Sequence, residues 1–312
     1  MTASREFRVA ARLGLATTVL IFVLMVIGSI VRTTGSGLAC PDWPLCHGQW
    51  IPPLEPKVLI EWTHRLVALV VSVLLVGTAV WSIVRPVLRP RLGVLAALAM
   101  VLLAVQIMLG ALTVLKLLDP AIVGGHLGVA LLLLCTLLTM TLIARRHEEG
   151  ADLPPQGASR PPGLLPTLGL TTAAAFAQSL LGGAVAASHA ALVCPDWPTC
   201  NGVWWPPMEG LVGLHMSHRF GGYTLALLVV VTAIRARRAT DPAVRLGGAL
   251  VLGLTLTQIV LGVANLYMAT PPWLVALHLA TAIAILATLV TVSFRVASLA
   301  PVGRRWVARE AQ

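Results

Sequence analysis

The stretch Cys40-Pro-Asp-Trp-Pro-Leu-Cys46 occurs twice in this chain, returning as Cys194-Pro-Asp-Trp-Pro-Thr-Cys200 at an offset of 154 residues. Other motifs return at nearly the same distance. The offset is 154 between His64-Arg65 and His218-Arg219 and 152 between His126 and His278. Because so many matches in register are very improbable by chance, we predict that the chain consists of two duplicated halves.

The composition is that of a membrane protein. Of the 312 residues, 57% are hydrophobic and 11% are charged, whereas a soluble domain carries about 25% charged residues. The formal charge of +10 accompanies long apolar runs and a mean hydropathy of +0.88, so nucleic-acid binding is excluded. Five cysteines are too few for a disulfide-rich secreted scaffold of this length.

Eight stretches are long and apolar enough to cross a membrane as helices, which takes about 20 residues each. They cover residues 13–32, 62–84, 92–115, 121–144, 164–187, 214–235, 246–268 and 273–294. We therefore predict an all-α polytopic membrane protein. Because each half holds an even number of helices, both halves enter the membrane in the same sense. The expected architecture is a parallel repeat of two four-helix bundles side by side.

A short segment rich in proline and charge divides the two halves. It covers residues 145–162, and its composition is typical of a cytoplasmic linker. The predicted organisation is an N-terminal half at 1–144, this linker, and a C-terminal half at 163–312. Each half carries one copy of the cysteine motif, in a connection between its first and second helices.

The basic residues predict the orientation in the membrane, since short cytoplasmic connections are enriched in Lys and Arg. Of the 22 basic residues, 17 fall at the termini or in the connections that lie on the same side as the termini. Both termini are therefore expected in the cytoplasm and the cysteine-bearing connections outside, in a cell membrane. The 17 are Arg5, Arg8, Arg12, Arg85, Arg89, Arg91, Arg145, Arg146, Arg160, Arg235, Arg237, Arg238, Arg245, Arg295, Arg304, Arg305 and Arg309.

Four histidines lie within the predicted helices, where an ionisable residue is costly and suggests a function. The pairs are His64 with His126, and His218 with His278. Each pair combines the second and fourth helices of one half, near the outer boundary. Two histidines facing each other in a helical bundle are typical axial ligands of haem iron, so two haem sites are predicted. The alternative is a set of histidines that merely hydrogen-bond neighbouring helices.

The residues beside these histidines offer further candidates. Arg65 and Arg219 each follow a histidine and could pair with a haem propionate, or else anchor the chain at the interface. Glu61 precedes His64 by three residues, whereas His215 occupies the matching position before His218. Glu61 could move protons or stabilise positive charge at a substrate, or it could simply face water. This difference suggests that only the N-terminal half performs chemistry.

The paired cysteines lie on the predicted outer side, where disulfides persist. Cys40 with Cys46, and Cys194 with Cys200, could form structural disulfides or act as redox-active pairs. The second pair favours the structural interpretation. Cys135 has no partner in sequence and is expected to be a small core residue.

In these features the chain resembles the haem A synthase family, in its bacterial class that carries the cysteines. The resemblance covers residues 13–294 and rests mainly on Thr34-Gly-Ser-Gly-Leu38, the cysteine motif, and Glu61-Trp-Thr-His-Arg65. It implies oxidation of the C8 methyl of haem O to a formyl group by successive hydroxylations, giving haem A for terminal oxidases. By matching positions, His64 and His126 would ligate the substrate haem, with Glu61 essential nearby.

The resemblance also implies the cofactor and the partners. His218 and His278 would ligate a haem b in the C-terminal half. The partners would be haem O, the haem O synthase that makes it, and the assembly of terminal oxidases. An external electron donor or acceptor is required, because the sequence has no flavin or iron–sulfur motif. The sequence does not indicate an oligomeric state.

Two other functions compete with this one. A membrane cytochrome b that transfers electrons would place its haems near opposite faces of the bilayer, whereas these histidines all lie toward one face. A non-catalytic haem carrier has no evident need of a carboxylate at Glu61.

Overall fold

The computed structural model describes residues 2–150 and 159–301, and within them it contains eight long helices. All eight are long and apolar enough to cross a membrane, which confirms the predicted polytopic all-α class. The helices are α1 (Ala3–Thr33), α2 (Pro56–Val84), α3 (Arg89–Leu115), α4 (Pro120–Glu148), α5 (Leu164–Ala187), α6 (Gly210–Ala236), α7 (Pro242–Tyr267) and α8 (Pro272–Ala297).

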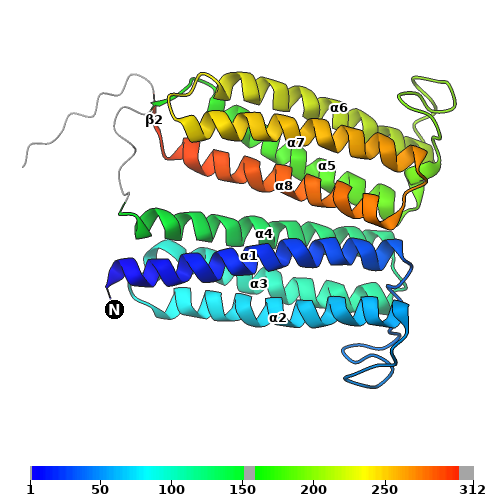
Figure 1. The fold of residues 1–312 in the computed structure, drawn as a ribbon, viewed down its shortest axis with the longest axis horizontal. Helices are drawn as coiled ribbons and strands as arrows, with labels where there is room; N and C mark the ends of the chain where they lie inside the picture. The colour runs from blue at the N-terminus through cyan, green and yellow to red at the C-terminus, as the bar shows by residue number, and fades with distance from the viewer. Residues whose placement is uncertain (1, 151–158, 302–312) are drawn as a thin grey trace, which may run out of the picture.

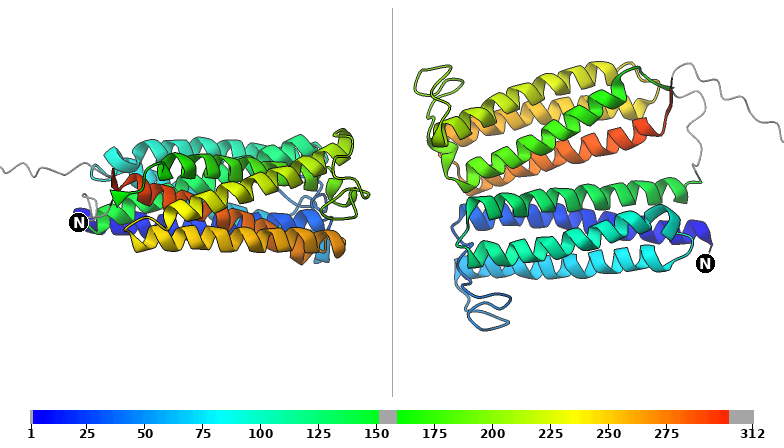
Figure 2. Two further views of the ribbon diagram at one scale, coloured as in Figure 1. Left: turned by 90° about the horizontal axis from the view of Figure 1, so that it is seen from above. Right: turned by 180° about the vertical axis from the view of Figure 1, so that it is seen from behind.

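The helices form two groups of four that lie side by side (Figure 1). One group is α1–α4 and the other is α5–α8, and they meet where α1 and α4 face α5 and α8. The connections that carry the cysteines lie at the same end of the molecule, opposite the end at which the chain begins (Figures 1 and 2). That placement agrees with a parallel repeat, while the symmetry relation itself stays a prediction.

Helix starts follow from local sequence. Pro120 and Pro242 occupy the first turn of α4 and α7, where a missing backbone N–H costs nothing. The preceding residues, Asp119 and Asp241, accept hydrogen bonds from the first free N–H groups, for example from Ala121 at 2.9 Å. These caps fix where two of the helices enter the bundle.

The structure extends most of the predicted spans, with α2, for example, beginning at Pro56 instead of residue 62, and two of the extensions contact each other. Helix α1 begins at Ala3, ten residues before the expected span, because the helix continues past the apolar core. Helix α4 runs to Glu148, so the first part of the expected linker at 145–162 is helical. These two extensions support each other through the ion pair between Arg8 and Glu148 at 2.8 Å.

The remainder of the expected linker contains only a short described element. Strand β1 (Ser159–Arg160) pairs in parallel with β2 (Ala300–Pro301), which brings the start of α5 and the end of α8 together. Residues 151–158 of the linker, together with Arg304, Arg305 and Arg309 of the orientation argument, lie outside the described residues.

Matching hydrogen bonds join the first two helices of each half. The Thr17 and Thr78 hydroxyls are 3.3 Å apart, and those of Thr171 and Thr232 are 2.8 Å apart. Both pairs are buried and lie at the same 154-residue offset as the cysteine motif. Interhelical hydroxyl bonds stabilise packing where no water is available to compete.

At the loop end, an arginine forms a hydrogen bond between the two groups. Arg32, in the last turn of α1, donates from Nη1 to the Ala186 carbonyl at the end of α5, at 3.0 Å. The final carbonyls of a helix lack intrahelical partners and carry partial negative charge, so a guanidinium is well suited to this position. Arg32 therefore fixes the relative height of α1 and α5.

Glycine sets how closely α6 and α7 approach. A Cβ placed on Gly248 would lie 2.6 Å from the Ala236 Cβ and 3.5 Å from the Ala233 backbone, both on α6. On the same helix, a Cβ on Gly253 would meet nothing within 4 Å. Gly248 thus allows a contact that a larger residue would prevent.

We predict that Gly248→Leu destabilises the fold by about 1–3 kcal/mol, because the added side chain must push α7 away from α6. Thermal unfolding of the purified protein in detergent measures the change. Gly253→Leu is the matched control and should unfold at the wild-type temperature. Equal unfolding temperatures for both variants would contradict the assignment of Gly248 to a close helix contact.

Candidate functional site

The four histidines predicted as ligands lie at corresponding depths in four helices. His64 and His218 are eight residues into α2 and α6, and His126 and His278 are six residues into α4 and α8. At about 1.5 Å rise per residue, all four rings lie about 9–12 Å along their helices from the loop end. All are half-buried. The structure thus brings the four together at one end of the molecule.

Each half contributes one of these histidines from its second helix and one from its fourth. In the first half these are His64 on α2 and His126 on α4, and in the second they are His218 on α6 and His278 on α8. Each pair therefore spans one four-helix group, from its second helix to its fourth.

Every one of the four rings packs against a glycine of a neighbouring helix. A Cβ on these glycines would lie 2.9–3.2 Å from the histidine Cε1 atom, closer than nearly all real contacts. Replacing any of them would therefore displace a ring. The pairs are Gly28 with His64, Gly110 with His126, Gly182 with His218, and Gly262 with His278.

Glutamine side chains contact three of the rings. Gln106 reaches Nε2 of His126 at 3.3 Å, and Gln258 reaches Nε2 of His278 at 3.2 Å. The third contact joins Gln178 to Nδ1 of His218 at 2.9 Å. Such contacts orient an imidazole and decide which of its nitrogens is available to a ligand.

These surroundings fit a haem. The Nδ1 atoms of His64, His126 and His278 are buried without a hydrogen-bond partner, and such atoms are costly unless another ligand or proton acceptor satisfies them. A glycine of a neighbouring helix lies against each ring. Among the described residues there is no cluster of three or more His, Cys, Asp or Glu, as a zinc site needs. Paired imidazoles in an apolar bundle suit axial ligation of iron.

Each cysteine motif forms a compact loop closed by a disulfide. Cys40 is bonded to Cys46 with a Cα–Cα distance of 4.7 Å, and Cys194 to Cys200 with 4.6 Å. Trp43–Pro44 and Trp197–Pro198 are cis peptide bonds. The disulfides agree with one of the two predicted interpretations, and a redox role stays a prediction. Cys135 is the free cysteine among the described residues and packs against the core.

An aspartate fastens each loop from inside. The Asp42 carboxylate accepts hydrogen bonds from the backbone N–H groups of His47 and Gly48, at 2.6 and 2.7 Å. The backbone N–H of Gly48 is the main cause that lowers the pKa of Asp42. In the second loop, Asp196 accepts in the same way from Asn201 and Gly202.

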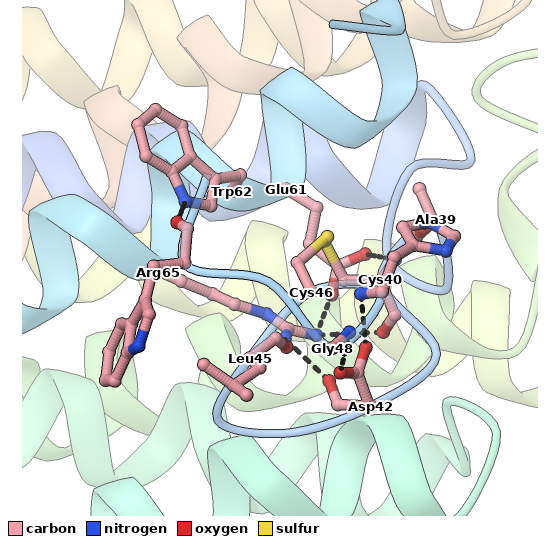
Figure 3. The surroundings of a disulfide bond; sticks show 11 residues. Ala39, Cys40, Asp42, Leu45, Cys46, Gly48, Glu61, Trp62 and Arg65 are labelled. Carbon is pink, nitrogen blue, oxygen red and sulfur yellow. Dashed lines mark hydrogen bonds and ion pairs between the residues drawn. A yellow bond between two sulfur atoms is a disulfide. The ribbon is translucent and has the colours of Figure 1, made fainter. Parts of the chain in front are cut away.

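Arg65 joins the first loop to α2 (Figure 3). Its Nη1 donates to the carbonyls of Asp42 at 2.7 Å and Leu45 at 2.6 Å, and its Nη2 donates to that of Cys40 at 2.9 Å. Arg219 makes the same three bonds, to the carbonyls of Asp196, Thr199 and Cys194. The terminal nitrogens of both arginines are therefore occupied by the loops. A role toward a haem propionate stays a prediction.

Glu61 is buried, with 3% of its surface exposed, so it does not face water. One carboxylate oxygen forms an ion pair with Arg65 at 2.5 Å, and the other accepts from the Cys40 backbone N–H at 2.8 Å (Figure 3). The carboxylate therefore lies between α2 and the first loop. In the second half, His215 accepts from the Arg219 Nε at 3.2 Å instead.

Sequence reasoning did not find the three-carbonyl arginine contacts, the two aspartates or Gln178. The aspartates are repeated within the cysteine motif, so their signal was available. The acceptors of Arg65 and Arg219 are backbone carbonyls, which leave no mark in the sequence. Gln178 has no counterpart in the first half, since the same offset leads to Leu24.

Comparison with known proteins gives a consistent result. The family model described as cytochrome oxidase assembly protein (COX15-CtaA) matches residues 11–290. Haem A synthase of Halalkalibacterium halodurans is 32% identical over 224 residues, which are 71% of this chain and 74% of that protein. Haem A synthase of Symbiobacterium thermophilum is 31% identical over 254 residues, 80% and 83% of the two chains. That of Geobacillus kaustophilus is 29% identical over 269 residues, 81% and 83%.

The second loop leads to a prediction of how the reduction rate of its disulfide depends on pH. The Thr199 hydroxyl and the backbone N–H groups of Gly202 and Asn201 lower the pKa of Asp196 to about 2. A carboxylate with a lowered pKa stabilises its loop above its ordinary pKa, and this contribution is lost as the pH falls toward 2. We therefore expect reduction of the Cys194–Cys200 disulfide by a phosphine to accelerate only below about pH 4.

Asp196→Asn tests this through one residue. The amide keeps one acceptor but turns an NH₂ group toward a backbone N–H, so the Cys194–Cys200 bond should be reduced faster at neutral pH. The Cys40–Cys46 bond of the same molecule is the internal control and should keep its rate. Mass spectrometry of alkylated peptides measures both. An unchanged Cys194–Cys200 rate would show that Asp196 does not hold the loop.

Proposed function

The chain belongs to the haem A synthase family of cytochrome oxidase assembly proteins, and on that premise we propose that it oxidises the C8 methyl of haem O to a formyl group. The observation that carries the proposal is the presence of two histidine pairs at corresponding depths of the two halves, with each ring packed against a glycine. One pair has a buried carboxylate in the adjoining turn and the other does not. The relatives' printed name supports haem A biosynthesis as the setting.

We assign the substrate to the N-terminal half and a resident cofactor to the C-terminal half. His64 and His126 would hold the haem O, and His218 and His278 would hold a haem b. Bound haem supplies redox-active iron, which removes or delivers electrons. The reason for this division is Glu61, since only the first half has an acidic group one helical turn before its histidine.

The contacts of Glu61 suggest its role. The carboxylate receives a charged donor from Arg65 and a backbone donor from Cys40, so both oxygens are engaged. A carboxylate held in this way acts best as a fixed negative charge. We infer that Glu61 stabilises positive charge that develops at the substrate during oxidation, in surroundings that exclude water and strengthen such interactions.

The overall change requires a redox partner. Converting a methyl to a formyl group removes four electrons and four protons when water supplies the oxygen, and dioxygen as oxygen source requires an electron donor instead. An external electron donor or acceptor therefore belongs to the proposal. So do delivery of haem O from haem O synthase and transfer of haem A to terminal oxidase assembly. The basic residues support cytoplasmic termini and haem sites toward the outer face.

The two competing functions fit less well. A cytochrome b that conducts electrons across the bilayer needs haems at different depths, but the four histidines lie at one end of the helices. A haem carrier has no use for a buried carboxylate beside one haem alone. Extraction of haem from the cells discriminates both, because only an enzyme changes the haem itself.

We predict that Glu61→Gln lowers haem A formation at least about tenfold, as the loss of a preorganised electrostatic contact does in other active sites. Glutamine keeps an acceptor for the Cys40 N–H, so the first loop and the bound haem should remain. The measurement is chromatography of haems extracted from cells that also make haem O, in which haem O should accumulate. Glu55→Gln, an exposed glutamate just before α2, is the control. Normal haem A in Glu61→Gln would overturn the role of Glu61.

We predict that His278→Ala removes haem b from the C-terminal half and leaves the N-terminal half able to bind haem. The expected result is loss of about half of the haem per protein molecule, since one of two bis-histidine sites is broken. Reduced-minus-oxidised spectra and haem quantification measure it. Haem content equal to that of the wild type would contradict the division between the halves.

A further inference from the structure

The two halves hold their first histidine differently. The amide nitrogen of Gln178 on α5 lies 2.9 Å from His218 Nδ1 and donates to the His218 carbonyl at 2.8 Å. Gln178 thus contacts both the ring and the backbone of one residue. In the first half, the offset that relates His64 to His218 places Leu24 where Gln178 stands.

The helix that carries His218 is shaped to receive the glutamine. A Cβ on Gly221 would lie 2.3 Å from Gln178 Oε1, and one on Gly222 would lie 3.5 Å from its Nε2. Gly221 therefore makes the room that the amide occupies. The matching positions on α2 are Val67 and Ala68, which carry side chains. Three positions differ together, as expected if the glutamine and its space form one unit.

His64 consequently lacks the glutamine contact that the other three histidines have. Glutamines contact His126, His218 and His278, whereas His64 has no hydrogen-bond partner among the described residues. Its Nδ1 is buried without a hydrogen-bond partner, and the residue at the Gln178 position of this half is the apolar Leu24. No hydrogen bond among the described residues thus resists rotation of the His64 ring, which packs against Gly28.

The Gln178 contact has a definite consequence for a metal ligand. A hydrogen bond at one ring nitrogen orients the imidazole and leaves the other nitrogen for the metal. For His218 the free nitrogen is Nε2. If Nε2 held a haem iron, Nδ1 would carry the ring proton, and the amide of Gln178 would turn so that Oε1 accepts it in exchange for the bond to the His218 carbonyl. Removing such a partner commonly weakens metal binding by about 10–100-fold.

We propose, resting on the function proposed above, that His64 is the exchangeable axial ligand of this protein and that Gln178 is a positioning residue that locks His218 in place. With a haem bound in the N-terminal half, the His64 ring would be free to turn away and give a small molecule access to the iron. In the C-terminal half, Gln178 would hold His218 in place and keep that access closed. The presence of the Gln178 amide in one half, and its absence from the other, thus decides in which half a small molecule can reach the haem iron.

Carbon monoxide tests the proposal without measuring turnover, because it binds ferrous haem only where an axial ligand leaves. The full-length protein is loaded with two equivalents of haem b, reduced, and mixed with carbon monoxide in a stopped-flow spectrometer. In the wild type we expect one of the two haems to bind carbon monoxide rapidly. Gln178→Leu should make the second haem reactive, with its rate raised at least about fivefold, the effect of losing one hydrogen bond.

The reverse change introduces the glutamine and its two glycines into the first half. The variant L24Q/V67G/A68G recreates Gln178, Gly221 and Gly222 beside His64 and should slow the reactive haem by a similar factor. Leu24→Gln alone is a second variant, in case the two added glycines weaken α2. The matched control is Ser179→Ala, beside Gln178, whose hydroxyl bonds only the Ala175 carbonyl of its own helix.

The outcomes separate this inference from the proposed function. Two bound haems with equal carbon monoxide rates in the wild type, or rates that neither Gln178→Leu nor Leu24→Gln changes, would overturn the locking role. Failure of the wild-type protein to bind haem would instead overturn the proposed function, and the inference with it. Haem content and thermal unfolding of each variant show that a changed rate does not come from misfolding.

Discussion

Four contacts between an imidazole ring and a glycine set the spacing of the helices at the functional end of this protein. A histidine inside a membrane bundle is costly unless it is enclosed by protein. Here each ring lies against a neighbouring helix at a position without a side chain, at Gly28, Gly110, Gly182 and Gly262. The odd-numbered helices supply the glycines and the even-numbered helices supply the rings, so one rule builds all four contacts.

The loops depend on the same helices. His64 and Arg65 are adjacent on α2, and one faces the bundle while the other holds three carbonyls of the first loop. A rotation of this helical turn would therefore move the ring and the loop together. The second half repeats the arrangement with His218 and Arg219. The disulfide and the aspartate keep each loop compact. The arginine then links the position of the loop to that of the neighbouring histidine.

Hydropathy and the repeat were enough to predict eight helices and two histidine pairs, because apolar length and recurring motifs are written directly in the sequence. Helix ends were harder, since α1 and α4 continue as polar helices stabilised by the Arg8–Glu148 ion pair. The arginine contacts were hidden because their acceptors are backbone carbonyls. Gln178 was hidden for the opposite reason. Only one half possesses it, and it lies 40 residues from His218 along the chain, whereas Glu61 lies three residues from the repeated His64.

That last limitation identifies where the halves have different tasks. The duplicated features are those that any such bundle needs: ring-supporting glycines, disulfide loops and loop-binding arginines. Two polar differences lie near the first histidine of each half: His215 occupies the position that matches Glu61, and Gln178 occupies the position that matches Leu24. The first half has a buried carboxylate one helical turn before a ring without a hydrogen-bond partner, and the second half has an amide that contacts its ring. A site that must admit a reactant needs the former, and a site that only keeps a cofactor needs the latter. Both differences, Glu61 against His215 and Leu24 against Gln178, are therefore consistent with a reacting first half and a cofactor-holding second half.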